Sequence, residues 1–367
     1  MFKKNVINTV RRSVVAGASA LLLAPMMMSG AGAAEKLKVG FVYVGPVGDH
    51  GWSYEHNQGR LAVQTAFGDV VKTTYVESVP EGADAERVIT KLAKSGYKLI
   101  FTTSFGYMNP TLKVAKRMKK VKFEHATGFK RSKNVATYSA RFYEGRYVVG
   151  HLAGKMTKSN TIGYVASFPI PEVIRGINAV TLAARKVNPK VQVKVIWVNS
   201  WYDPGKEADA AKTLIDQGAD IIMQHTDSPA PVQVAEKRGV WSVGQASDMS
   251  NFGPKTHMTA IVDNWGPYYI ARTKAALEGT WKSQDTWGGF NTGMVQMAPY
   301  NKRLPADVVA LAKSIQLGIG NGKIHPFAGP IKDQSGKVVI AAGATADDGM
   351  LAGMNFYVEG VVGSIPK

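Results

Sequence analysis

The chain has 367 residues, with 45 Lys and Arg against 27 Asp and Glu, and it contains no cysteine. Without cysteine we expect no disulfide, no thiolate metal site and no lipid-anchored N-terminus, so burial must stabilise the fold. The formal charge of +18 would suit a nucleic acid or an anionic membrane as a partner. However, the basic residues are scattered, and their densest cluster, over 113–122, has the pattern of a solvated helix face. We therefore predict a monomer with no nucleic-acid partner.

Residues 1–34 have the pattern of a cleaved signal peptide. Four basic residues precede an apolar run over 14–28, and small residues follow it. The run is shorter than the ~20 residues that a membrane-spanning helix needs. We therefore expect an exported, soluble, periplasmic chain that begins near Glu35.

The next part of the chain alternates short β-branched runs with helical patterns. Strands separated by helices in this way predict a parallel sheet that is covered on both faces. The predicted elements are a strand over 37–44, a helix over 52–67, a strand over 71–76, a helix over 85–93, a strand over 99–103, a helix over 109–118 and a strand over 121–124.

The same alternation restarts further along the chain and predicts a second α/β sheet. Asp203 and Pro204 suit the cap and first position of a helix in this half. The predicted elements are a strand over 162–165, a helix over 171–186, a strand over 191–198, a helix over 205–217, a strand over 221–223 and a helix over 232–237.

Two lobes are expected, because about 330 residues remain after the signal and single cores tend to split beyond ~250–300. Crossing strands at 135–142 and 257–264 are predicted to join the lobes. Lobe 1 is predicted over 35–139 with 262–290, and lobe 2 over 140–261 with 291–367.

Linear signatures of common enzymes are missing from the sequence. It has no phosphate loop, no dinucleotide-binding glycine motif, no zinc-protease helix and no nucleophile elbow. Its seven histidines never fall at a metal-ligand spacing. The sequence therefore predicts no enzyme, no cofactor and no metal.

The loops after the predicted strands are rich in aromatic and acidic residues. Ligands of open α/β sheets bind at the carboxyl ends of the strands, so these loops are the candidate site. Aromatic faces with carboxylates suit a flat, nitrogen-rich ligand such as a purine base. Trp197 is expected to pack in the core, and whether Glu144 and Asp263 face the cleft or the hinge stays open. The candidate ligand-binding residues are Trp52, Ser53, Phe105, Glu144, Phe168, Trp201, Asp227, Asp248, Met249 and Asp263.

Five sequence pieces, in order and spacing, carry a resemblance to a known family. They are Lys38–Val42, Thr103–Met108, Phe142–Tyr147, Ile162–Val165 and Val243–Asp248. In these pieces the chain resembles the basic membrane protein family of substrate-binding proteins for ABC importers, which includes purine-nucleoside receptors. The resemblance implies an α/β type I periplasmic-binding fold, in which two doubly wound, parallel-sheet lobes close on a purine-like ligand and dock on an inner-membrane permease.

The resemblance also implies roles for single residues. Trp52 matches an aromatic residue that stacks on the base, and Asp248 matches an aspartate that meets the sugar. Where the nucleoside receptors typically have a lysine, this chain reads Ile261–Asn264, so we expect a free base such as adenine. The missing lipobox cysteine makes the expected receptor freely diffusing.

Other functions remain open at this point. The ligand could be a purine nucleoside or another flat nitrogenous solute. An exported nucleoside hydrolase would need Glu144 and Asp227 near one reacting bond. Adhesion driven by positive charge is the third alternative, and moderate salt would abolish it.

Overall fold

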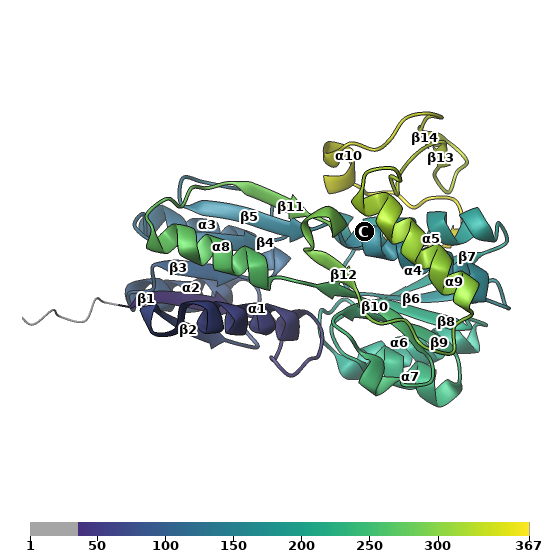
Figure 1. Ribbon diagram of the computed structural model, residues 1–367, viewed down its shortest axis with the longest axis horizontal. Helices are drawn as coiled ribbons and strands as arrows, with labels where there is room; N and C mark the ends of the chain where they lie inside the picture. Colours follow the sequence, from purple (N-terminus) through teal and green to yellow (C-terminus); the bar gives the residue numbers. More distant parts are fainter. Residues whose placement is uncertain (1–35, 367) are drawn as a thin grey trace, which may run out of the picture. The chain divides into compact units, whose positions relative to one another are not determined.

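The computed structural model describes residues 36–366 (Figure 1). The predicted signal peptide therefore lies outside the described residues. None of the helices within 36–366 combines the length and the apolar character that a membrane span requires.

Lobe 1 is built on a six-stranded parallel sheet in the order β2-β1-β3-β4-β5-β11. Helices α1 and α8 pack together on one face, and α2 and α3 on the other (Figure 1). Its elements are β1 (Leu37–Val42), α1 (Trp52–Phe67), η1 (Gly68–Val70), β2 (Val71–Val76), α2 (Ala83–Lys94), β3 (Leu99–Thr102), η2 (Phe105–Tyr107), α3 (Met108–Arg117), β4 (Lys122–Ala126), β5 (Val135–Ala140), α8 (Gly266–Leu277) and β11 (Asp285–Gly288).

Lobe 2 is built on a seven-stranded sheet in the order β12-β10-β9-β8-β6-β7-β15, in which only β12 runs antiparallel to its neighbour. Helices α4, α5 and α9 lie on one face, and α6 and α7 pair on the other (Figure 1). Its elements are α4 (Phe142–Met156), β6 (Thr161–Ala166), α5 (Pro171–Val187), β7 (Gln192–Trp197), α6 (Pro204–Asp216), β8 (Ile221–His225), α7 (Ala230–Arg238), β9 (Trp241–Ala246), η3 (Ser250–Phe252), β10 (His257–Asp263), η4 (Phe290–Thr292), β12 (Val295–Met297) and α9 (Ala306–Gly320).

Within residues 36–366 the chain passes between the two sheets three times. The segment after β5 leads into α4, the segment after β10 leads into α8, and the segment after β11 leads through η4 into β12. The first two crossings directly follow β5 and β10, which lie within the predicted joining strands. The third crossing lies at the predicted boundary between residue 290 of lobe 1 and residue 291 of lobe 2, where the sequence analysis placed no joining strand.

The core of lobe 1 behind the cleft is a layer of aromatic side chains. Phe41 and Phe101 stack at 4.7 Å between ring centroids. The Tyr269 hydroxyl lies 2.7 Å from the Tyr138 hydroxyl and 2.5 Å from His56 Nδ1. These contacts satisfy three polar groups inside an apolar core, so they help to fix the ring positions.

Helix α4 packs unusually close to α5, and glycine makes that approach possible. A Cβ atom on Gly150 would lie 2.6 Å from the Val180 carbonyl oxygen, and one on Gly154 would lie 2.5 Å from the Ala184 carbonyl oxygen. Every residue of α4 from Phe142 to Gly154 is buried. A helix that is buried on all sides has no polar face, and for this reason the sequence pattern did not reveal α4.

The chain ends in a segment that returns across lobe 2. We call residues 336–366 the C-terminal segment. It contributes β15 to the edge of the lobe 2 sheet beside β7, and its α10 packs against α5. The last elements are β13 (Ile331–Lys332), β14 (Val338–Ile340), α10 (Asp348–Ala352) and β15 (Val361–Val362).

The strands and helices predicted up to residue 237 are confirmed, with every boundary within two residues. The Asp203 cap is also confirmed, because its Oδ1 accepts a hydrogen bond from Lys206 N at 3.1 Å. Trp197 is partly buried and its Nε1 donates to the Tyr357 hydroxyl at 3.1 Å, as its predicted packing role requires.

Candidate functional site

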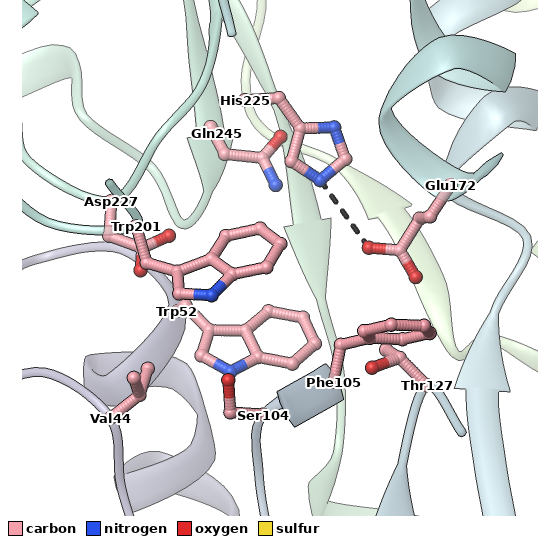
Figure 2. Close-up of a pocket in the computed structure, with 10 residues that line it drawn as sticks. All are labelled: Val44, Trp52, Ser104, Phe105, Thr127, Glu172, Trp201, His225, Asp227 and Gln245. Atoms are coloured by element: carbon pink, nitrogen blue, oxygen red, sulfur yellow. Dashed lines mark ion pairs between the residues drawn. The ribbon is translucent and has the colours of Figure 1, made fainter. Parts of the chain in front are cut away.

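The carboxyl ends of the strands of both sheets meet around a small cavity between the lobes (Figure 2). Its volume is about 20 Å³. Side chains of both lobes line it, with aromatic rings from each and most of the ionisable groups from lobe 2. The lining residues are Val44, Trp52, Ser104, Phe105, Thr127, Glu172, Trp201, His225, Asp227 and Gln245.

Trp52 is the aromatic residue that lobe 1 holds most firmly. It is 9 % exposed and stands at the first position of α1. Its Nε1 donates to the Thr103 carbonyl oxygen at 2.6 Å. Edge-to-face contacts with His56, Trp265 and Phe142, at 4.3, 5.7 and 6.0 Å between centroids, surround the indole. The ring is therefore positioned before any ligand arrives.

Trp201 faces the cavity from lobe 2 but is held across the cleft. It follows β7 and packs at 5.0 Å from the Phe168 ring. Its Nε1 donates to Glu81 Oε1 of lobe 1 at 3.2 Å. The same Glu81 oxygen accepts from Ser104 Oγ at 2.5 Å and from Gly106 N at 3.0 Å. Trp201 thus gains its polar contact only when the lobes are together.

Asp227 is a buried carboxylic acid at the meeting point of the lobes. It is 4 % exposed, and its Oδ2 has no hydrogen-bond partner among the described residues. Its backbone oxygen lies so close to Gly51 that a Cβ atom at that position would clash with it. Burial, and then the charges of Asp49 and Glu207, raise the pKa of Asp227 well above its usual range. A carboxyl that favours its neutral form can both donate and accept.

His225 and Glu172 form the other polar corner of the cavity (Figure 2). His225 Nε2 lies 3.4 Å from Glu172 Oε1, and His225 Nδ1 has no partner among the described residues. Burial lowers the pKa of His225, although the hydrogen bond with Glu172 opposes this. Behind them, Arg146 donates to Gln245 Oε1 and, at 2.8 Å, to the Gln224 carbonyl oxygen. Arg146 thereby orients the Gln245 amide toward the cavity.

A second hollow of about 210 Å³ adjoins the cavity on the hinge side. The two spaces share Phe105, Thr127 and Glu172 as lining residues. Arg175 and Trp287 line the far part of the hollow. The cleft therefore continues toward the crossing strands as a roomier space, which we call the second hollow.

The structure brings four of the ten sequence-predicted site residues to the cavity: Trp52, Phe105, Trp201 and Asp227. Phe168 lines a neighbouring surface hollow beside Trp201. Ser53 does not line the cavity, and its hydroxyl accepts a hydrogen bond from Gly45 N at 3.1 Å.

The other four candidates lie outside the cavity lining. Glu144 accepts from Phe290 N at 2.7 Å, which places it at the third crossing and apart from Asp227. Asp248 is exposed and accepts from Ser250 N at 3.0 Å. Met249 is fully buried. Asp263 is fully buried at the end of β10, and both of its carboxylate oxygens lack partners among the described residues.

Sequence reasoning did not select Glu172, His225, Gln245, Ser104, Thr127 or Val44. His225 and Ser104 lie in loops that follow predicted strands, so their loop position was the available signal. Gln245 lies inside β9 and Glu172 lies one residue into α5, beyond the loops that were searched. Within residues 36–366 no group of three acidic or histidine side chains could hold a metal ion.

Comparisons with known proteins agree with this architecture. The model of a family described as PnrA-like ABC transporter substrate-binding proteins matches residues 36–335. The chain is 58 % identical over 346 residues to a purine-binding protein of Brucella abortus, which spans 94 % of this chain and 99 % of that protein. It is 38 % identical to a Haloferax volcanii protein named as a glucose-binding protein of an ABC transporter, over 91 % of this chain and 82 % of that one.

Solved structures show the same fold at lower identity. A solute-binding protein of an ABC transporter system from Aeropyrum pernix matches with a TM-score of 0.70 and 20 % identity, over 80 % of this chain and 94 % of that chain. One from Conexibacter woesei matches with a TM-score of 0.64 and 19 % identity, over 79 % of this chain and 98 % of that chain. The predicted type I periplasmic-binding fold is confirmed.

Proposed function

The chain belongs to the PnrA-like family of ABC transporter substrate-binding proteins, and on that premise we propose that it binds a purine base between its lobes and delivers it to an ABC permease. Members of this family are solute receptors and not enzymes. The observation that carries the choice of ligand is the cavity itself, which is lined by aromatic rings from opposite lobes and by the buried Asp227 carboxyl group. One oxygen of this group has no hydrogen-bond partner among residues 36–366.

The aromatic residues suit a flat guest. Trp52 and Trp201 come from opposite lobes, and Phe105 closes the side of the cavity (Figure 2). Indole faces stack on a planar ring system and bury a large apolar area. With Trp52 fixed inside lobe 1, the base would first stack on that ring and then be covered by Trp201.

The polar groups suit the edge of a purine. Adenine presents hydrogen-bond donors and acceptors side by side along its edge. A neutral Asp227 carboxyl can both donate and accept. The Gln245 amide nitrogen can donate while its Oε1 accepts from Arg146, and His225 keeps Nδ1 without a partner among the described residues. A ligand that satisfies Asp227 Oδ2 and His225 Nδ1 would remove the cost of leaving buried polar atoms unpaired.

Relatives and sequence favour a free base over a nucleoside. The Brucella protein, named as purine-binding, is similar over almost the whole length of both chains. This chain has no lysine in the Ile261–Asn264 stretch, where the nucleoside receptors typically place one for the ribose. A purine nucleoside is the second candidate, because the second hollow would give its sugar room beside Phe105 and Thr127.

Closure of the lobes would couple binding to delivery. The lobes already meet where Gly51 approaches Asp227 and where Ser247 Oγ donates to the His50 carbonyl oxygen. A cavity of about 20 Å³ cannot admit a purine without some separation of its walls. We take this structure as the closed form and expect hinge opening about the three crossings to admit the ligand.

The delivery role carries a location with it. We propose that residues 1–34 direct export and that the mature receptor works in the periplasm beside an inner-membrane permease. Sequencing the N-terminus of the protein recovered from the periplasmic fraction tests this, and a first residue near Glu35 is expected. Recovery in the cytoplasm with an intact N-terminus would contradict the proposal.

Ligand identification tests the proposed function directly. Native mass spectrometry of protein purified without added ligand should reveal a bound purine base. Calorimetry should then rank adenine above adenosine and both above glucose. Tighter binding of adenosine would favour the nucleoside candidate, and binding of glucose alone would make the purine proposal wrong.

The hydrolase alternative has its own control. The protein would be incubated with adenosine, and release of free adenine would be followed by chromatography. We expect no release of adenine above the rate without protein. Glu144 accepts a hydrogen bond from Phe290 N at the third crossing, and it does not line the cavity together with Asp227.

A further inference from the structure

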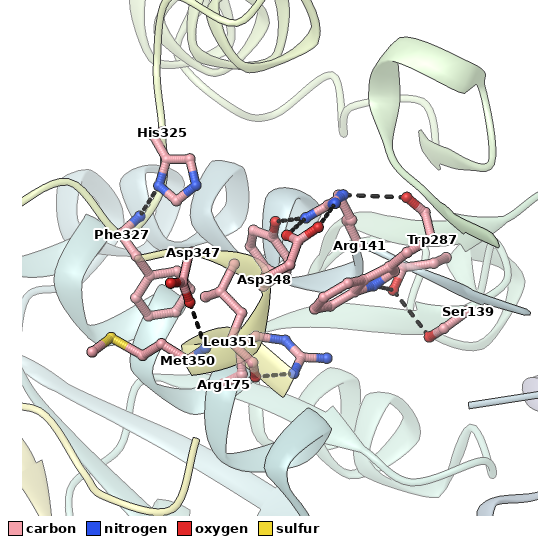
Figure 3. Close-up of polar contacts among 12 residues, drawn as sticks. Ser139, Arg141, Arg175, Trp287, His325, Phe327, Asp347, Asp348, Met350 and Leu351 are labelled. Carbon is pink, nitrogen blue, oxygen red and sulfur yellow. Dashed lines mark hydrogen bonds and ion pairs between the residues drawn. The ribbon is translucent and has the colours of Figure 1, made fainter. Parts of the chain in front are cut away.

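Glu172 and Arg175 lie three residues apart on α5, a spacing at which opposite charges commonly pair on a helix. Among the described residues, however, the basic group within 4.0 Å of the Glu172 carboxylate is the His225 imidazole in the cavity, at 3.4 Å. Arg175 instead donates from its Nη1 to the Leu351 carbonyl oxygen at 2.5 Å (Figure 3). The fold therefore keeps the Arg175 guanidinium away from the Glu172 carboxylate, although their spacing on α5 would allow them to pair.

The C-terminal segment supplies that restraint. Leu351 belongs to α10 and is fully buried, so its carbonyl oxygen is a fixed acceptor for Arg175. The Arg175 guanidinium also lies over the Trp287 ring, 4.9 Å from its centroid. Arg175 is 4 % exposed, which means that it has few alternatives to the partners that surround it. The family model ends at residue 335, before this segment begins.

Asp348, at the start of α10, anchors the segment to the hinge. Its two oxygens accept hydrogen bonds from Arg141 Nη1 and Nη2 at 2.7 and 2.8 Å, a bidentate pair (Figure 3). Arg141 in turn donates through Nε to the Trp287 carbonyl oxygen at 3.2 Å, and its guanidinium lies 4.5 Å from the Trp287 ring centroid. Two guanidinium groups thus share one indole at the hinge.

The charges around Arg175 show why Asp348 matters. Burial lowers the pKa of Arg175, the Glu172 and Asp348 charges raise it, and the Arg141 charge lowers it. Without the Asp348 carboxylate, Arg141 would lose its bidentate partner, and the repulsion between Arg141 and Arg175 beside the shared Trp287 ring would be less fully compensated. The nearest remaining carboxylate on the same helix would then be Glu172, which lines both the cavity and the second hollow.

We propose that Asp348 and α10 are positioning elements of the binding site, because they hold Arg175 against the C-terminal segment and leave the Glu172 carboxylate free for the cavity. This inference rests on the proposed function, because the free Glu172 carboxylate would then contact both His225 and the ligand. Arg175 would otherwise neutralise Glu172 and occupy the second hollow.

A double-mutant cycle tests the proposal with adenine as the probe. Calorimetry would compare wild type, Asp348→Asn, Arg175→Gln and the double variant. Asp348→Asn alone is expected to weaken adenine binding about 5- to 30-fold, a loss in the range measured for residues that are energetically coupled. In the Arg175→Gln background, the same substitution should change adenine affinity by less than about twofold. An equal loss in both backgrounds, or no loss in either, would overturn the proposal.

Glu359→Gln is the matched control. It removes an ion pair of the same C-terminal segment, with Arg185 at 3.0 Å, but this pair lies away from the cavity and the hinge. Both variants should melt at similar temperatures, and Glu359→Gln should bind adenine like wild type. If both weaken binding equally, general loosening of the segment explains the effect and the positioning role is wrong.

A crystal structure of ligand-free Asp348→Asn tests the same point without any ligand. The Arg175 guanidinium is expected within 4 Å of the Glu172 carboxylate. Arg175 still bonded to the Leu351 carbonyl oxygen would overturn the positioning role. Failure of wild type to bind any purine would count against the proposed function alone, since the crystal structure decides the position of Arg175 independently.

Discussion

The two walls of the cavity are built by different means. On the lobe 1 side, Trp52 donates a hydrogen bond to the Thr103 carbonyl oxygen and packs against other buried aromatic rings. On the lobe 2 side, Trp201 depends on Glu81 across the cleft, and Asp227 and His225 each keep one atom that has no partner within residues 36–366. The comparison indicates that lobe 1 offers a preformed stacking surface, whereas lobe 2 is completed only by closure and by the ligand.

The largest loss of purine affinity should come from removing the Trp52 side chain, which forms the lobe 1 wall of the cavity. Trp52→Ala is expected to weaken purine binding by about 2–4 kcal/mol, the range of a buried aromatic hot spot. Calorimetry measures this loss. Trp197→Ala is the control, because Trp197 packs beside Tyr357 and does not line the cavity. It should lower thermal stability while leaving affinity close to wild type, and equal affinity losses would contradict a stacking role for Trp52.

Substitutions of Asp227 test the lobe 2 wall of the cavity, where we expect the second largest loss of purine affinity. Asp227→Ala should cost about 1–3 kcal/mol of binding, because a ligand group is left unsatisfied. Asp227→Asn should retain most of the affinity, because an amide, like a neutral carboxyl, offers a donor and an acceptor. Calorimetry near pH 7 separates the two. Equal losses for Ala and Asn would mean that the negative charge itself binds the ligand.

The bond across the cleft should have a smaller effect. Trp201→Phe keeps an aromatic ring but removes the donor to Glu81, at an expected cost of about 0.5–1.5 kcal/mol. The loss should fall mainly on the dissociation rate, which stopped-flow fluorescence measures. Trp52→Phe is the contrasting variant, because it should lower thermal stability through the unpaired Thr103 carbonyl oxygen. A slower association rate with unchanged dissociation would contradict a closure contact for Trp201.

The smallest effect is a pH dependence on the lobe 1 side. Burial, and then the Asp49 charge, raise the pKa of Glu55 from its ordinary 4.5 to about 8. Since the folded protein holds this proton more tightly than the unfolded chain, the stabilisation is complete below about pH 4.5 and is lost as the pH rises through 8. Glu55 is only partly buried, so water screens much of this shift. Glu55→Gln should therefore stabilise the protein at pH 9 by about 1 kcal/mol, well below the full value of the shift, and have little effect at pH 4.

Urea unfolding at the two pH values measures this difference. Glu278→Gln is the control, because Glu278 is exposed and lies 3.8 Å from Lys274 on the surface. The same pH dependence in both variants would mean that Glu55 is not the group responsible.

Only some of the predicted loop residues reach the cavity. Trp52 and Asp227 follow β1 and β8, and both reach the cavity. The sequence prediction placed Asp248 and Glu144 among the candidates equally well, yet Asp248 turns to Ser250 N and Glu144 to Phe290 N. Chain position specifies the edge of the sheet, but the partners within each loop decide which side chains turn inward.

The sequence by itself determined the alternation of strands and helices, because strands covered on both faces must be runs of apolar residues and the helices that cover them must be amphipathic. Only the tertiary structure decided that α4 is buried from Phe142 to Gly154, that Asp227 Oδ2 has no partner in the described part of the chain, and that Arg175 turns to Leu351 rather than to Glu172. Each of these depends on contacts between segments far apart in the chain. Local pattern carries no record of such contacts, because burial and pairing are properties of the folded assembly of elements.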